Sequence, residues 1–384
     1  MPPRSPARHA ESLFRRTFGS GPDVIASAPG RVNLLGEHTD YNGGPVFPVA
    51  LERRTAVAAG RFDAWELVSS AEPDVVTADI DAPMQGRWSD YLVGVVRELR
   101  AIGAAPGGAR IAVDSSVPIG AGLSSSAALT VSGARALSLL AGKRLSLEQL
   151  VDVAFRAEHD QVGVRVGRMD QTISAHGKAG TALLFETATG TLERVPMPGR
   201  IWIVETGVSH KLTGGELNDR RRECDQALAL LQGRWPSLRF LAEIPPSDLP
   251  AAEDLLAEDA LRRRVRHVVT ETARTRAAAA ALEGRDLAEL GRLMLAGHRS
   301  LQVDYQSSVA EADAIVASAA ARGAYGARLS GAGWGGAVLL LAPEPHERPI
   351  VAGVVDDFVE RFGRRPVTWS THAAGGVRRE PIRG

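Results

Sequence analysis

A glycine- and serine-rich segment that leads straight into a helix restricts the fold of this chain more than any other stretch. The segment reads VPIGAGLSSSAALTVSGARAL and spans Val117–Leu137. Its glycines permit a left-handed backbone and a close approach to the main chain, and the residues from Ser126 onward have helical periodicity. Such a loop turns the free N–H groups and the positive dipole end of a helix toward an anion. The segment therefore predicts a phosphate site, although a serine-capped helix after a glycine turn explains these residues alone equally well.

Two nucleotide-binding motifs of other fold classes are excluded by their context. The Gly–Ser segment lacks the lysine of a P-loop. GAGWGG at Gly331–Gly336 has the spacing of a dinucleotide-binding loop, but the strand-like run AVLLLA follows it where that fold requires a helix. We therefore predict a glycine turn that approaches the nucleotide phosphates or the Gly–Ser loop. A glycine hairpin needed only for close contact between elements stays open as the alternative.

Strand-like and helix-like segments follow one another without regular alternation. Short β-rich runs occur at Val24–Ser27 and Ile201–Glu205, whereas helical periodicity is clear over Leu147–His159. This order favours α+β layers over a doubly wound parallel sheet. Because 384 residues are many for a single core, we predict two domains, 1–198 and 199–384, divided near the turn PMPG.

Composition limits the classes of function. Lys plus Arg and Asp plus Glu number 45 each, so the charge balance does not favour nucleic acid as a partner. The single cysteine, Cys224, excludes an intramolecular disulfide and a cysteine-based zinc cluster. No apolar run has the length of a membrane helix, and the first residues lack the apolar core of a secretory signal. We therefore expect a cytoplasmic protein that binds small molecules, with no membrane, nucleic-acid or obligate protein partner.

A second motif concentrates charge within glycine- and proline-rich sequence. Ala26–Leu51 contains Arg31, Glu37, His38 and Asp40, and it contains no lysine. Carboxylates accept hydrogen bonds from sugar hydroxyls, and an arginine neutralises phosphate oxygens during transfer. We predict a site for a hydroxyl-rich ligand here, with a surface loop and a solvated ion pair as the alternative. The spacing of these residues does not match a metal-binding motif.

Two acidic residues within Arg156–Glu186 have the chemistry that phosphoryl transfer requires. The reaction needs a metal on the phosphates, a cation near the moving group and a carboxylate on the proton of the nucleophile. Glu158 and Ser126 offer hard oxygen ligands suited to Mg²⁺, and Asp170 offers a carboxylate that orients or deprotonates a hydroxyl. Taken singly, each acid is more often a helix cap or a surface charge.

Three separated stretches together resemble one family. APGRVNLLGEHTDYNGG resembles the galactokinase signature, GAGLSSSAA resembles the phosphate motif of the GHMP kinases, and RLSGAGWGG resembles their third motif. WSDYLVGV, GRMDQ and HRSLQVDYQSS extend the similarity over most of the chain. The first motif is specific, because other GHMP kinases carry no EHTDYN run. The chain thus resembles a galactokinase-type sugar kinase, which moves the γ-phosphate of ATP onto the anomeric oxygen of galactose.

The resemblance also implies a fold and a set of site residues. The implied fold is the α+β GHMP kinase fold, with an N-terminal domain like domain 2 of ribosomal protein S5 and a ferredoxin-like C-terminal domain, and with sugar and ATP between them. Asp170 is the implied catalytic carboxylate, Arg31 is its cationic partner, and Ser126 and Glu158 are the implied ligands of Mg²⁺. The implied sugar contacts are Glu37, His38, Thr39, Asp40 and Gly167. The implied contacts to the ATP phosphates are Gly120, Ala121, Gly122, Leu123, Ser124, Ser125 and Ser126.

Three positions depart from the galactokinase pattern. Leu217 stands where the family has a sugar-contacting tyrosine, Arg168 replaces an aliphatic residue, and Val166 replaces a common cysteine. We expect Arg168 either to point to solvent or to bind an anionic or altered sugar. The first alternative function is therefore a sugar 1-kinase for a uronic acid, arabinose, an amino sugar or another hexose. The second is a sensor that binds galactose and ATP without catalysis, and the intact Gly122–Ala127 and Asp170 argue against it.

Overall fold

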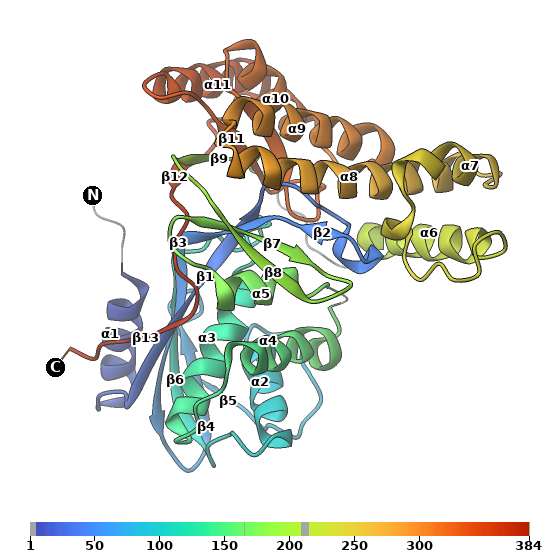
Figure 1. Cartoon of the computed structure of the whole chain (residues 1–384). Coiled ribbons are helices and arrows are strands. Elements are labelled where there is room, and N and C mark those ends of the chain that lie inside the picture. Colours follow the sequence, from blue (N-terminus) through green and yellow to red (C-terminus); the bar gives the residue numbers. More distant parts are fainter. Residues whose placement is uncertain (1–4, 165, 209–214, 384) are drawn as a thin grey trace.

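The structure is a computed structural model that describes residues 5–164, 166–208 and 215–383. Its helices and strands form layers around three sheets (Figure 1). The strands are β1 (Val24–Asn33), β2 (Pro45–Val46), β3 (Pro48–Arg61), β4 (Trp65–Ser69), β5 (Val76–Thr77), β6 (Ala109–Ser115), β7 (Thr181–Glu186), β8 (Thr191–Pro196), β9 (Ile201–Glu205), β10 (Gly326–Ser330), β11 (Ala337–Leu341), β12 (Thr368–Thr371) and β13 (Arg378–Glu380). The helices are α1 (Pro6–Phe18), α2 (Asp90–Ala101), α3 (Ser125–Leu140), α4 (Leu147–Arg156), α5 (Met169–His176), α6 (Gly215–Leu231), α7 (Leu249–Asp254), α8 (Asp259–Glu283), α9 (Leu287–Ser300), α10 (Ala310–Ala321) and α11 (Glu347–Phe362).

A six-stranded sheet in the order β13-β1-β3-β6-β4-β5 carries the first half of the chain. Helix α1 packs on one face, and α3 and α5 pack on the other with α2 and α4 outside them (Figure 1). Because both faces are covered, β1 is buried along its whole length and lacks the alternation of a half-exposed strand. Among the described residues, β4 and β6 are the one parallel pair of this sheet, which confirms the prediction of mixed α+β layers.

The second half is built on a four-stranded antiparallel sheet in the order β10-β11-β9-β12. Helices α9 and α10 pack against β10. Strand β9 has the predicted bounds, and β11 follows the glycine turn as predicted. The helix predicted over Leu147–His159 ends earlier, at Arg156, and a π-helical turn over Ala157–Val162 continues it. That turn carries Glu158 into the site.

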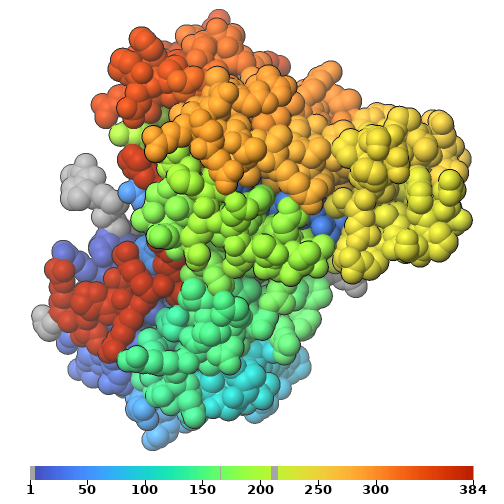
Figure 2. All heavy atoms as spheres, viewed as in Figure 1, coloured from blue at the N-terminus to red at the C-terminus, as the bar shows by residue number. Residues whose placement is uncertain are grey.

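A shared apolar core joins the two sheets. Val32 and Phe47 from the first half are fully buried in one cluster with Ile203 and Leu339 from the second. The small sheet β2-β7-β8 and the pairing of β13 with β1 add further connections. Helices α6 and α7 form a lobe that projects from the body (yellow in Figure 2). The boundary between 198 and 199 stays a prediction.

Within residues 5–164, 166–208 and 215–383, no helix combines the length and the apolar character that a membrane span requires.

Candidate active site

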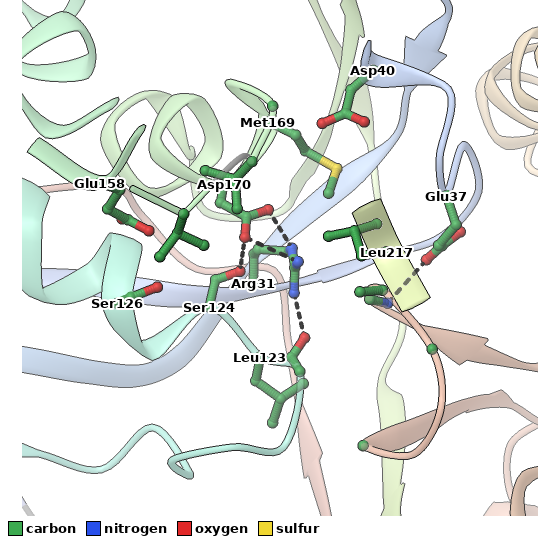
Figure 3. A pocket seen from close by; sticks show the side chains of 18 of the residues that line it. Arg31, Glu37, Asp40, Leu123, Ser124, Ser126, Glu158, Met169, Asp170 and Leu217 are labelled. Carbon is green, nitrogen blue, oxygen red and sulfur yellow. Dashed lines mark hydrogen bonds and ion pairs between the residues drawn. The ribbon is translucent and has the colours of Figure 1, made fainter. Parts of the chain in front are cut away.

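A cavity of about 490 Å³ opens where the two halves of the chain meet. Arg31, Glu158 and Asp170 line it from the first half, and Leu217 and Gly331 line it from the second. Figure 3 shows the side chains of Arg31, Glu158, Asp170 and Leu217 converging from separate elements. The volume is that of a small-molecule site, and the lining contains several carboxylates and hydroxyls.

Asp170 and Arg31 form an ion pair in this cavity (Figure 3). Arg31, from β1, donates from Nε to Oδ1 at 2.8 Å and from Nη2 to Oδ2 at 3.0 Å of Asp170, which lies in the first turn of α5. The Ser124 hydroxyl also donates to Oδ2. Two parallel bonds to one guanidinium fix the plane of the carboxylate. The two residues predicted to be catalytic, 139 positions apart, are thus in direct contact.

The Gly–Ser loop has a left-handed backbone at three positions. Gly120, Gly122 and Ser124 have φ angles of 75°, 70° and 57°. Helix α3 begins directly afterwards, so its first N–H groups, which have no partner within the helix, face the loop. The glycine turn packs on this loop, because a Cβ on Gly331 would lie 2.9 Å from the Gly122 carbonyl oxygen. The geometry is that of an anion site bounded by both glycine motifs.

Glu158 lies almost fully buried at the same end of the cavity, with 2% of its surface exposed. Its Oε1 accepts hydrogen bonds from the Thr130 hydroxyl at 3.0 Å and from the Gln171 amide at 3.1 Å. Burial raises its pKa to about 7, the hydrogen bond from Gln171 lowers it in part, and the charge of Asp170 raises it further. The Ser126 hydroxyl acts on the same carboxylate. These hard oxygen donors fit Mg²⁺, which binds through few carboxylates together with phosphates and water.

Asp40 lines the opposite end of the cavity. Its Oδ1 accepts a hydrogen bond from the Tyr41 N–H at 2.9 Å. Burial raises the pKa of Asp40 to about 6, and the charge of Asp170 adds to this effect. Gly167 faces this carboxylate so closely that a Cβ there would lie 1.7 Å from Oδ2. The absence of a side chain at Gly167 therefore makes room for the carboxylate that was predicted to contact the sugar.

Glu37 lines the same end and is tied to the second half of the chain. Its Oε2 forms an ion pair with Arg328, and its Oε1 accepts from the Gly331 N–H at 3.4 Å. Arg328 also contacts Glu271 Oε1 at 2.8 Å, and all three side chains are at most 1% exposed. Burial raises the pKa of Glu37 to about 7, although Arg328 opposes the shift. The sequence analysis did not predict the buried contact between Arg328 and Glu271. The one signal for it in the sequence was an arginine within the otherwise apolar run before the glycine turn.

The remaining predicted contacts divide into two groups. His38 lines the cavity, as do all the predicted phosphate contacts except Ala121. Thr39 is not part of the lining: it is fully buried, and its hydroxyl donates to the carbonyl oxygens of Gly36 at 2.8 Å and Pro45 at 2.6 Å. Its geometry is that of a residue which stabilises the turn around His38, so the predicted sugar contact of Thr39 has no support here.

Comparison with known proteins identifies the family. The galactokinase galactose-binding signature matches residues 12–61, and the N-terminal and C-terminal domains of the GHMP kinases match residues 90–178 and 278–360. A galactokinase of Chloroflexus aurantiacus is 43% identical over 374 residues, which cover 95% of this chain and 96% of the relative. The chain belongs to the galactokinase family. A galactokinase of Streptomyces coelicolor is 38% identical over 378 residues, again with 95% and 96% coverage.

Solved structures agree with this assignment to the galactokinase family. The crystal structure of Lactococcus lactis galactokinase complexed with galactose superposes with a TM-score of 0.92 at 29% identity, over 97% of this chain and 99% of that chain. Mevalonate kinase of Methanococcus jannaschii superposes with a TM-score of 0.63 at 18% identity, over 91% and 98%, and shares the fold. The predicted GHMP kinase fold is confirmed.

The departures from the galactokinase pattern lie in different places. Leu217, at the start of α6, lines the cavity near Asp40 (Figure 3). Arg168 is not part of the lining: its guanidinium forms an ion pair with Asp152 and lies 5.1 Å from the centre of the Phe155 ring. Its side chain is 46% exposed, so of the two expectations for Arg168 the structure agrees with the one that points it to solvent. Val166, like Leu217, is part of the lining, so these two departures lie within the site.

Proposed function

We propose that this protein phosphorylates the anomeric hydroxyl of galactose with ATP and releases galactose 1-phosphate and ADP. The observation that carries the proposal is the Asp170–Arg31 pair, which lies between the Gly–Ser loop and the Glu37–Asp40 segment in one cavity. Membership of the galactokinase family and the match to its galactose-binding signature support galactose as the acceptor.

Asp170 is the proposed catalytic carboxylate. Arg31 and Ser124 occupy three of its four lone-pair sites, and the one that remains, on Oδ1, can accept the proton of the sugar C1 hydroxyl. As the C1 oxygen bonds to the γ-phosphorus, the bond from that phosphorus to the ADP oxygen breaks and the hydroxyl proton passes to the carboxylate. Arg31 holds the carboxylate in place and adds positive charge beside the reacting oxygens.

Gly120–Ser126 are the proposed contacts to the ATP phosphates, through N–H groups at the start of α3. Ser126 and Glu158 are the proposed ligands of Mg²⁺, which neutralises charge on the β- and γ-phosphate oxygens when it is bound. The raised pKa of Glu158 supports this role, because a buried carboxylate that ionises near neutral pH gains from a cation beside it.

Glu37, His38, Asp40 and Gly167 are the proposed determinants of the sugar subsite, with Asp40 as an acceptor for sugar hydroxyls. A second candidate function, a 1-kinase for another sugar, is favoured by one observation: the apolar Leu217 at this subsite offers no hydrogen bond. A cytoplasmic location, in which ATP and free sugar meet, completes the proposal.

A coupled ADP-release assay tests the proposal. The purified chain is supplied with ATP and Mg²⁺ and with galactose, glucose, mannose, arabinose, galactosamine or galacturonate in turn. We expect turnover of galactose, with phosphorus NMR of the product showing phosphate on C1. Turnover of another sugar without turnover of galactose overturns the choice of acceptor. Binding of both ligands with no sugar phosphate formed overturns the enzymatic proposal.

A further inference from the structure

A line of hydrogen-bonding groups leads from the second half of the chain to His38. The Nδ1 atom of His38 lies 2.8 Å from the Tyr41 hydroxyl, which lies 2.8 Å from the Tyr305 hydroxyl. The Cys224 sulfur lies 3.5 Å from the same Tyr305 oxygen. Tyr305 and Cys224 are at most 1% exposed, so water does not replace these partners.

Each group along this line keeps its proton at neutral pH. Burial raises the pKa of the Tyr41 and Tyr305 phenols well above their ordinary value, and it raises the pKa of the Cys224 thiol to about 11. The line therefore has three links and three hydroxyl or thiol protons. If all three are donated toward the cavity, Nδ1 of His38 is the final acceptor, and the one ring proton of the neutral imidazole is on Nε2.

The surroundings of the second ring nitrogen, Nε2, favour donation of the protons toward the cavity. Within the described residues, Nε2 is buried and makes no hydrogen bond, although His38 lines the cavity. The main-chain carbonyl of Ala332 acts on the ring and partly offsets the strong lowering of its pKa by burial. Because Nδ1 already pairs with the Tyr41 hydroxyl, the unpaired Nε2 is the nitrogen from which a ring proton can reach an acceptor in the cavity, and a nearby carbonyl, which only accepts, agrees with a proton there.

The backbone conformation and a stacked neighbour also restrict the orientation of the His38 ring. His38 has a left-handed backbone with a φ of 65°, which is uncommon for a residue with a side chain and tends to occur at functional sites. Its imidazole stacks on the Tyr305 ring, with centroids 4.2 Å apart and an angle of 23° between the planes. A flipped ring would place Cδ2 instead of Nδ1 beside Tyr41, so the stack fixes the plane of the ring and the bond to Tyr41 fixes which nitrogen faces it.

We infer that Tyr41 and Tyr305 are positioning residues that hold His38 as the neutral Nε2–H tautomer, so that it presents a hydrogen-bond donor to an acceptor oxygen of the sugar. The inference rests on the proposed function for the identity of the ligand, but the assignment of the tautomer does not. It explains why a cavity with several carboxylates also needs a neutral donor: a carboxylate accepts from sugar hydroxyls and cannot donate to a sugar oxygen.

Nitrogen-15 NMR of the full chain labelled at histidine tests the tautomer directly. His38→Gln identifies the signals of His38 by their loss. We expect Nδ1 of the wild-type protein to have the shift of an unprotonated ring nitrogen and Nε2 that of a protonated one. A proton on Nδ1 with an unprotonated Nε2 overturns the inference, whichever sugar the protein uses.

The variant Tyr41→Phe tests the positioning. We expect the two nitrogen shifts to move toward each other as the tautomers exchange, KM for the sugar to rise about tenfold through the loss of one hydrogen bond, and kcat to change little. Tyr305→Phe keeps the stacked ring and is expected to show the same changes to a smaller extent, so it serves if Tyr41→Phe does not fold. Tyr325→Phe, outside the cavity, is the matched control and should change neither measurement.

Unchanged nitrogen shifts and unchanged KM in both tyrosine variants overturn the inference. If galactose is not phosphorylated but the wild-type shifts are as expected and move in Tyr41→Phe, the proposed substrate is wrong and the positioning role stands. The two proposals therefore fail separately.

Discussion

Two arginine–carboxylate pairs in and beside the cavity differ in their access to ligand. Arg328 and Glu37 have side chains 0% and 1% exposed, and Glu271 shares the same guanidinium. Arg31 and Asp170 have side chains 7% and 19% exposed, and both line the cavity. The first pair joins the two halves of the chain beside the sugar subsite, whereas the second leaves one lone pair of its carboxylate free. Similar chemical groups thus support the fold in one place and the proposed reaction in the other.

The largest expected effect concerns the more open pair. Asp170→Asn keeps the shape of the side chain but removes the proton acceptor, so kcat should fall about 10²- to 10⁴-fold while the thermal midpoint stays close to that of the wild type. ADP release and thermal unfolding measure the two. Asp152→Asn, on the exposed partner of Arg168, is the matched control and should retain activity. An Asp170→Asn enzyme with wild-type kcat would show that this carboxylate is not catalytic.

The buried pair should respond in the opposite way. Arg328→Met leaves Glu37 and Glu271 without their cation, and removing one partner of a buried pair costs about 3–5 kcal/mol of unfolding free energy. Urea unfolding measures this loss. Arg31→Met provides the comparison, with a smaller loss of stability and a larger loss of kcat. Equal losses of stability in the two variants would remove the distinction between the pairs.

The sugar subsite should also respond to pH through Asp40. Because burial raises its pKa to about 6, this carboxylate is ionised above that pH and protonated below it. KM for galactose should therefore rise as the pH falls below 6, toward about tenfold per pH unit, because the protonated form is a poorer acceptor. Initial rates between pH 5 and 8 measure the effect. Asp40→Asn should abolish the slope; a slope that persists in this variant assigns it to another group.

The smallest expected effect concerns Leu217. Leu217→Tyr places a phenol at the sugar end of the cavity, where one new hydrogen bond is worth about 0.5–1.5 kcal/mol. KM for galactose should fall by up to about tenfold with little change in kcat. Steady-state kinetics on galactose and on the other sugars measures this. A variant that folds normally but binds galactose more weakly would mean that the sugar subsite has no room for a side chain larger than leucine at position 217.

Short motifs were enough to single out Asp170, Arg31 and Glu158 in the sequence, and the structure brings all three to one cavity. Their roles stay predictions. Arg328 and Glu271 were not predicted, because the cost of burying a charge depends on which segment folds beside it, and their contact is made 57 positions apart. Thr39 was predicted to contact the sugar because it stands within the galactokinase signature between His38 and Asp40, but its hydroxyl bonds to main-chain oxygens.

Secondary structure shows the same limit. The periodicity predicted one helix over Leu147–His159, because apolar spacing does not distinguish an α-helix from the π-helical turn that follows Arg156. The wider turn brings Glu158 to Thr130 and Gln171, which are distant in sequence. Local propensity does not encode such contacts.

The pairing of β13 with β1 has a consequence for synthesis on the ribosome. The Ser27 hydroxyl in β1 bonds to Glu380, 353 positions later. At 5–20 residues per second, translation needs on the order of 20–70 s to make the second partner. During that time the outer edge of β1 is an unpaired strand on the nascent chain, open to other chains and to chaperones. Short C-terminal deletions should therefore reduce the yield of native protein more than the small contact area of β13 suggests.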